Sequence, residues 1–148
     1  MTTSRLLPLF ALVSATAIAQ ATAAQPVQPP RTSPEEVALI EDGAKGLSVR
    51  HFPTSLPLYT FDDDPPGVST CKDGCATAWP PVRGGPDSKP FGDWTLVTRD
   101  DGAPQWAFKG KPLYVRYHDR PTAPSGDGVD GRWRLLQNIP KPAADAMR

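Results

Sequence analysis

The sequence predicts a small, mostly β domain built from two similar hairpin units. Nineteen of the 148 residues are proline, against a usual share of ~5%, and proline at that density disfavours long helices and central strands. Short runs rich in aromatic and β-branched residues alternate with turn residues along the chain, as in small antiparallel sheets. A third observation, an internal repeat, makes the same fold class more specific.

The repeat appears when the sequence is shifted by 55 residues. The matching positions are Pro57-Leu58-Tyr59 with Pro112-Leu113-Tyr114, Asp64 with Asp119 and, at a shift of 54, Trp79 with Trp133. A single hairpin is marginally stable in water, so we expect the two units to bury their aromatic faces against each other. The predicted fold is therefore a small antiparallel sheet or sandwich of two pseudo-repeated hairpin units, with at most a short helical turn near residues 72–78.

The N-terminus has the pattern of an export signal. Arg5 precedes an apolar run over residues 6–19, and small residues follow it. The run is shorter than the ~20 residues that span a bilayer, so we predict a cleaved signal peptide over residues 1–24, with the cut after Ala23 or Ala24. The expected location is periplasmic or secreted, with no membrane span after cleavage.

The rest of the chain divides into three parts. Residues 25–36 are rich in proline without periodicity and are predicted to be a flexible leader. A single β domain is expected over residues 37–139, and residues 140–148 are predicted to be a flexible tail.

The first element of the domain is ambiguous. Ser33 and Glu36 have the spacing of a helix-capping box, but Asp42-Gly43 is a turn signal only a few residues later. We therefore favour a strand over residues 34–41. Other strands are expected at residues 47–52, 58–61, 94–98, 105–108, 113–117 and 133–136, each bounded by turn residues.

Most aromatic side chains are expected in the core, since a proline-rich domain needs large buried faces. In the run from Gln105 to Phe108, alternation places Trp106 and Phe108 on one face, and Gln105 and Ala107 on the other.

Charge is balanced, with 16 basic and 16 acidic residues. Such balance gives no electrostatic argument for nucleic acid or anionic lipid as a partner. The expected partner is an envelope ligand or protein whose identity the sequence does not specify.

Several segments resemble a known bacterial family. Residues 57–64 (PLYTFDDD), 71–81 (CKDGCATAWPP) and 105–114 (QWAFKGKPLY) are similar to the exported "secreted repeat of unknown function" proteins, which carry a Tyr-x-aromatic-x-x-Asp motif. In the second copy Arg116 replaces the motif aromatic, with Tyr117 beside it. The resemblance implies an exported protein without an established activity. Its motif positions here are Tyr59, Phe61, Asp64, Trp79, Tyr114, Asp119 and Trp133.

Cys71 and Cys75 offer three readings. Three intervening residues, Gly74 among them, allow the ~4.4–6.8 Å Cα separation of a disulfide, and disulfides persist outside the cytosol. A disulfide is therefore predicted, with free structural thiols as one alternative. The other alternative is a Cu(I) or thiol-redox site with His51 or His118 as a third ligand; otherwise no cofactor is predicted.

The acidic residues suggest turns more than catalysis. Asp64 and Asp119 are expected to accept backbone N–H groups in the turns that follow their strands. A hard-cation site with Asp127 and Asp130 is the alternative. No nucleophile elbow or phosphate-binding glycine loop is present in the sequence. The predicted function is a non-catalytic binding or envelope-associated module.

Overall fold

The computed structural model describes residues 31–41 and 46–140. The predicted signal peptide, the first half of the leader, the Asp42-Gly43 turn and most of the tail lie outside these residues. The described part of the chain is mostly β, as the sequence predicts. Its elements are β1 (Val37–Glu41), β2 (Leu47–His51), β3 (Tyr59–Phe61), α1 (Gly74–Ala78), β4 (Trp94–Thr98), β5 (Pro104–Phe108), β6 (Lys111–Pro112), the 3-10 helix η2 (Val129–Gly131) and β7 (Trp133–Leu135).

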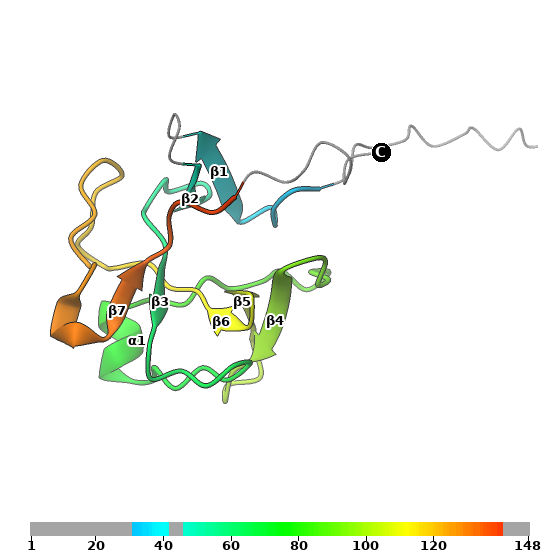
Figure 1. Ribbon diagram of the computed structural model, residues 1–148. Helices are drawn as coiled ribbons and strands as arrows, with labels where there is room; N and C mark the ends of the chain where they lie inside the picture. Colours follow the sequence, from blue (N-terminus) through cyan, green and yellow to red (C-terminus); the bar gives the residue numbers. More distant parts are fainter. Residues whose placement is uncertain (1–30, 42–45, 141–148) are drawn as a thin grey trace, which may run out of the picture.

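The strands of the described part form three small antiparallel sheets: β1-β2, β3-β7 and β4-β5-β6. Figure 1 shows β3 and β7 side by side, although they lie far apart in the sequence. Their register places Tyr59 opposite Leu135 and Phe61 opposite Trp133. The hairpins β1-β2 and β4-β5 join strands that are close in the sequence, whereas β3-β7 closes the domain.

The internal repeat is also a repeat of structure. In the first unit, hairpin β1-β2 is followed by Pro57, which pairs with Arg50. In the second, hairpin β4-β5 is followed by Pro112, which pairs with Ala107. Each unit thus adds a third chain segment to its own hairpin at the same proline of the repeat.

After that point each repeat pairs with the other. β3 of the first repeat pairs with β7 of the second. The equivalent segment of the second repeat, residues 114–117, pairs in turn with the first repeat. Val115 N–H donates to Pro80 O at 2.9 Å, and Tyr117 N–H donates to Ala78 O at 3.0 Å. Because the last segment of each repeat pairs with the other repeat, as strand β7 in one case and as the irregular segment around Pro80 in the other, neither repeat contains all of its own backbone partners.

The prediction of a strand over residues 113–117 is wrong, because these residues do not form a regular strand. The strand β6 covers only Lys111–Pro112, and Tyr114 makes isolated bridges to Tyr59 and Pro81. Pro80 and Pro81 on the opposite segment have no N–H to donate, so a continuous ladder cannot form there.

The alternative helix at the start of the domain is also excluded. Residues 37–41 form β1, and the Ser33 hydroxyl donates to Val37 O at 2.9 Å instead of capping a helix. The expected helical turn is present as α1, within the predicted residues 72–78.

In residues 31–41 and 46–140, buried hydrophobic side chains form two clusters. One lies among the hairpins and includes the predicted core residue Trp106, with Phe108 packed against it. The other lies where β3 and β7 meet, and most of its members are motif positions. Its buried residues are Tyr59, Phe61, Cys71, Trp79, Tyr114 and Trp133. Gln105 and Ala107, on the opposite face of β5, are fully buried as well.

Candidate functional site

The motif tyrosines face each other at the centre of the repeat interface, which we define by Tyr59, Asp64, Tyr114 and Asp119. Tyr59 N–H donates to Tyr114 O at 2.8 Å, and Tyr114 N–H donates to Tyr59 O at 2.9 Å. Both side chains are fully buried. This reciprocal pair lies where an approximate two-fold axis relates the repeats.

The motif side chains exchange partners across that axis. The Tyr59 hydroxyl donates to Asp119 Oδ2, and the Tyr114 hydroxyl donates to Asp64 Oδ2 at 2.7 Å. Each tyrosine therefore bonds to the aspartate of the other repeat. Buried phenol hydroxyls need acceptors, and here each repeat supplies the acceptor that its neighbour needs.

The second oxygen of each carboxylate accepts hydrogen bonds from a residue of its own repeat. Asp64 Oδ1 accepts from Thr70 N at 2.7 Å and Thr70 Oγ1 at 2.6 Å. Asp119 Oδ1 accepts from Ser125 N at 3.2 Å and Ser125 Oγ at 2.5 Å. These N–H bonds agree with the predicted turn role. Thr70 and Ser125 were not predicted, although the same 55-residue shift relates these two hydroxyl residues.

Burial raises the pKa of both Tyr59 and Tyr114 well above the usual value, and the bonded carboxylates add to the effect. The folded protein therefore holds these protons more tightly than the unfolded chain, whose tyrosines titrate near ~10. Stability from this source is fully present below pH ~10 and is lost as the pH rises above it.

This dependence can be measured in a Tyr117→Phe background, where Tyr59 and Tyr114 are the only tyrosines left of three. We expect the 295 nm absorbance of tyrosinate to stay flat beyond pH ~10 and to rise only as circular dichroism reports unfolding. A rise near that pH with native dichroism would contradict the prediction.

Stacked rings extend the interface. Trp79 and Trp133 stack with centroids 3.7 Å apart and planes at 5°, and Phe61 stacks on Trp133 at 4.5 Å. The Arg116 guanidinium lies over Trp79, 5.4 Å from the ring centroid. Arg116 thus occupies in the second repeat the place that Phe61 has in the first, which explains the departure from the motif. Tyr117 does not fill this place, since it is 66% exposed.

Arg116 should therefore be replaceable by an aromatic residue. Its guanidinium also donates to Ser125 O at 2.5 Å and Ser125 Oγ at 2.7 Å. We expect Arg116→Ala to lower the free energy of unfolding by about 1–2 kcal/mol through loss of stacking and hydrogen bonds. Arg116→Phe should recover part of that loss in urea unfolding experiments; a loss equal to that of alanine would contradict the equivalence.

Gly126 is where the backbone of the second repeat passes against these rings. A Cβ at this position would lie 2.7 Å from Tyr59 Cε1 and 2.8 Å from Trp79 Cη2. We expect Gly126→Ala to destabilise the protein by about 1–3 kcal/mol through overpacking. Gly74→Ala is the control, because a Cβ there meets nothing within 4 Å. Equal melting temperatures for the two variants would contradict the expected clash.

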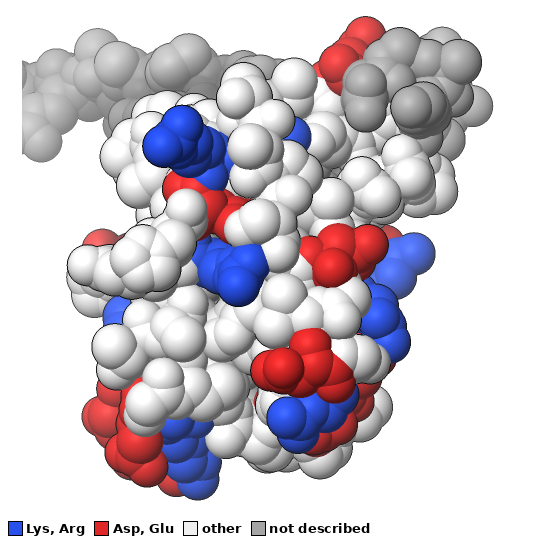
Figure 2. All heavy atoms as spheres, turned by 90° about the vertical axis from the view of Figure 1, so that its left-hand side faces the viewer, with Lys and Arg blue, Asp and Glu red and all other residues white. Residues whose placement is uncertain are grey.

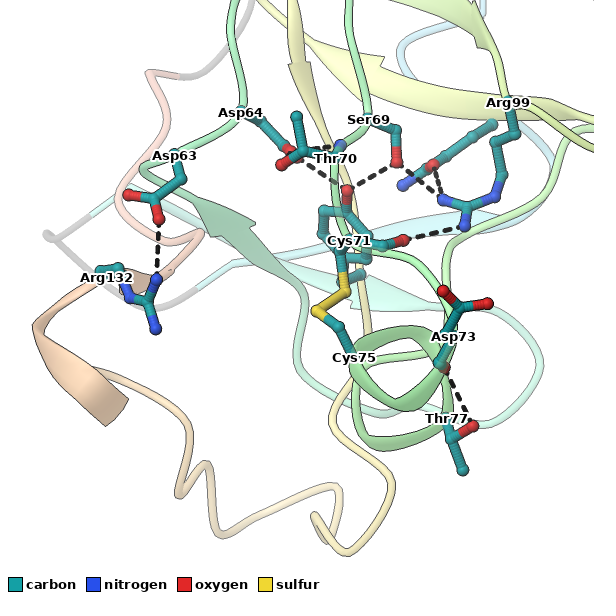
Figure 3. The surroundings of a disulfide bond; sticks show 12 residues. Asp63, Asp64, Ser69, Thr70, Cys71, Asp73, Cys75, Thr77, Arg99 and Arg132 are labelled. Carbon is teal, nitrogen blue, oxygen red and sulfur yellow. Dashed lines mark hydrogen bonds and ion pairs between the residues drawn. A yellow bond between two sulfur atoms is a disulfide. The ribbon is translucent and has the colours of Figure 1, made fainter.

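Cys71 and Cys75 form a disulfide with Cα atoms 5.3 Å apart, as the sequence predicts (Figure 3). In this state neither sulfur is a thiolate that could bind Cu(I). His51 Nδ1 is 2.7 Å from Thr54 Oγ1, and His118 packs against the ring of Tyr117. Within residues 31–41 and 46–140, no three His, Cys, Asp or Glu side chains gather as a metal site. The copper alternative stays a prediction for the reduced protein.

The sequence did not predict the role of Arg99, which is 9% exposed. Its Nη1 donates to Ser69 Oγ and to Gln105 Oε1, both at 2.7 Å, and its Nη2 donates to Cys71 O at 2.9 Å. The neighbouring run of Asp100, Asp101 and Gly102 has the composition of an exposed turn. No local signal therefore marked Arg99 as buried.

Other acidic residues serve surface contacts. Asp62 and Asp63 form exposed ion pairs with Arg134 and Arg132, each at 2.8 Å, and Asp127 Oδ1 accepts from Leu135 N at 2.9 Å. Figure 2 shows acidic and basic side chains next to each other across one face of the molecule.

Two hollows lined by described residues lie away from the repeat interface. One, of about 430 Å³, lies beside the β1-β2 hairpin and is lined by residues that include Ile40, Arg50 and Pro121. The other, of about 250 Å³, is lined by residues that include Glu36 and Trp106. The Glu36 carboxylate in the second hollow accepts from Trp106 Nε1 at 2.9 Å and from Gly85 N at 3.1 Å.

Comparison with known proteins identifies the repeat. Residues 53–83 and 95–137 match the family described as "secreted repeat of unknown function". The second segment covers most of the second structural unit, and the first covers the part of the first unit that follows hairpin β1-β2. No curated protein and no solved structure matches the chain. The family description agrees with the predicted periplasmic or secreted location, and no helix in the described part of the chain is long and apolar enough to cross a membrane. The chain therefore belongs to the family of secreted repeats of unknown function.

Proposed function

We propose that this protein is a non-catalytic, exported binding module that associates with the cell envelope. One observation carries the proposal: the motif residues stabilise the fold. Tyr59, Asp64, Tyr114 and Asp119 are buried and bond to one another across the repeats. General acid–base chemistry needs a group within reach of substrate, whereas these groups face the interior.

A binding surface must then lie outside the motif. The larger hollow beside β1-β2 combines an exposed apolar side chain, Ile40, with the cation Arg50. Ligand sites commonly pair apolar walls with a few polar groups. This hollow is our candidate surface for an envelope ligand.

The test is co-sedimentation of the exported, oxidised protein with purified peptidoglycan sacculi and, separately, with phospholipid vesicles. We expect it to pellet with one of these probes, and Ile40→Asp with Arg50→Glu to weaken pelleting without changing the melting temperature. Val68→Asp is the control, since Val68 is also 49% exposed but does not line that hollow. Absence of pelleting with both probes would contradict envelope binding. Release of soluble product from either probe, abolished by a single substitution, would contradict the non-catalytic assignment.

A further inference from the structure

The disulfide is connected to the repeat interface through a directed chain of hydrogen bonds (Figure 3). Arg99 bonds both to Cys71 O and to Ser69 Oγ. Ser69 Oγ lies 2.7 Å from Tyr114 OH, which donates to Asp64 Oδ2 at 2.7 Å. Every donor along the path from Arg99 points toward Asp64, so the chain runs from a buried cation to a buried carboxylate. Such aligned chains polarise one another.

The position of the Arg99 guanidinium depends on the disulfide loop. Among the described residues, Cys71 O is the backbone carbonyl that accepts from this guanidinium, and Arg99 Nε has no hydrogen-bond partner. A buried charge that loses an acceptor is destabilised more than a neutral group. Displacement of Cys71 should therefore disturb Arg99, and through Ser69 the hydroxyl of Tyr114.

The second repeat provides a matched comparison without this connection. At the 55-residue shift, Gly126 occupies the position of Cys71, and Gly126 N donates to Tyr59 OH at 3.2 Å. Tyr59 and Asp119 make the same motif hydrogen bond as Tyr114 and Asp64. In the described part of the chain, this half of the interface has no disulfide at the equivalent position and no contact equivalent to those of Arg99. Trp79, whose ring meets Tyr59, is joined to the disulfide loop through its backbone N–H, which donates to Cys75 O at 2.7 Å. Among the described residues, the path of side-chain hydrogen bonds from Cys71 O through Arg99 and Ser69 leads to the Tyr114–Asp64 half of the interface.

We propose that Cys71–Cys75 is a site of reversible reduction by a dithiol, and that its redox state sets the strength of the Tyr114–Asp64 half of the interface. Cys71 is 1% exposed, whereas Cys75 is only partly buried, so the incoming thiolate attacks Cys75 Sγ. The disulfide breaks, Cys71 leaves as a thiolate and takes up a proton, and a mixed disulfide forms at Cys75. The second thiol of the reductant then displaces Cys75, so two electrons pass and the dithiol becomes a disulfide.

The test uses the full folded protein and compares Tyr114→Phe with its repeat equivalent Tyr59→Phe. Each is unfolded in urea with intact disulfide and after treatment with dithiothreitol, with free thiols counted before unfolding. We expect reduction to raise the unfolding equilibrium constant in the wild type and in Tyr59→Phe by the same factor. In Tyr114→Phe the factor should be at least about threefold smaller, because one link of the chain is already absent.

In a second variant, Arg99→Met, reduction should raise the unfolding equilibrium constant by the same smaller factor as in Tyr114→Phe. Because the two substitutions interrupt the chain at different residues, a folding defect in one variant would not decide the test. If reduction changed the unfolding equilibrium constant by the same factor in all variants, the proposed coupling would be overturned, and the disulfide would stabilise only its own loop. A thiol count of zero after dithiothreitol treatment of the folded protein would overturn the exchange reaction.

Discussion

Replacing Asp64 by alanine is expected to lower the free energy of unfolding by about 3 kcal/mol or more. The substitution removes the acceptor for Thr70 N, for Thr70 Oγ1 and for the buried hydroxyl of Tyr114. The donor on Tyr114 then stays inside the protein, where water cannot replace the lost acceptor without opening the interface. Urea unfolding followed by tryptophan fluorescence measures the effect.

The neighbouring acid provides the control. Asp62 is exposed and pairs with Arg134 at the surface, so Asp62→Ala should change the free energy of unfolding by less than about 0.5–1 kcal/mol. Asp119→Ala should resemble Asp64→Ala, because the two carboxylates hold equivalent contacts. If the Asp64 and Asp62 variants are equally stable, the exchanged tyrosine–aspartate pairs do not hold the repeats together.

Trp133→Ala should have a comparable or larger effect, a loss of about 3–5 kcal/mol. The ring stacks on Trp79 and on Phe61 and meets the edge of Tyr114, so it contacts rings from both repeats. Its removal leaves a cavity at the axis that relates the repeats, and the surrounding rings can fill it only by moving the strands. Differential scanning calorimetry measures the loss.

An exposed aromatic residue is the matched control for this prediction. Tyr117 is 66% exposed, and Tyr117→Ala should stay within about 0.5 kcal/mol of the wild type. A Trp133→Ala protein with wild-type melting temperature and cooperativity would show that the stacked rings are dispensable, contrary to the fold described above.

The position of most strands follows from local sequence. The runs that became β2, β4 and β5 combine branched or aromatic residues with flanking turn residues, and such signals act within a few residues. The exception is the segment after β6: its own residues suit a strand, but Pro80 and Pro81 opposite it cannot donate. Local patterns contain no information on a partner's missing N–H groups.

The repeat interface was only half predictable. The 55-residue shift shows that Tyr59 is equivalent to Tyr114 and Asp64 to Asp119. The same pattern would fit pairs within each repeat as well as pairs exchanged between repeats. Which pairs form depends on how the strands cross in space, so no sequence comparison of one chain distinguishes them.

By itself, the sequence determined the class of fold, the repeat, the disulfide partners and the family, because each depends on composition, spacing or shared motif residues. Only the tertiary structure decided that the repeats exchange strands and hydrogen bonds, that Arg116 replaces a motif aromatic, and that Arg99 is buried beside Cys71. The physical reason is the same in all three cases. The energy of a buried polar or aromatic group depends on partners brought close by folding, and those partners lie tens of residues away in the sequence.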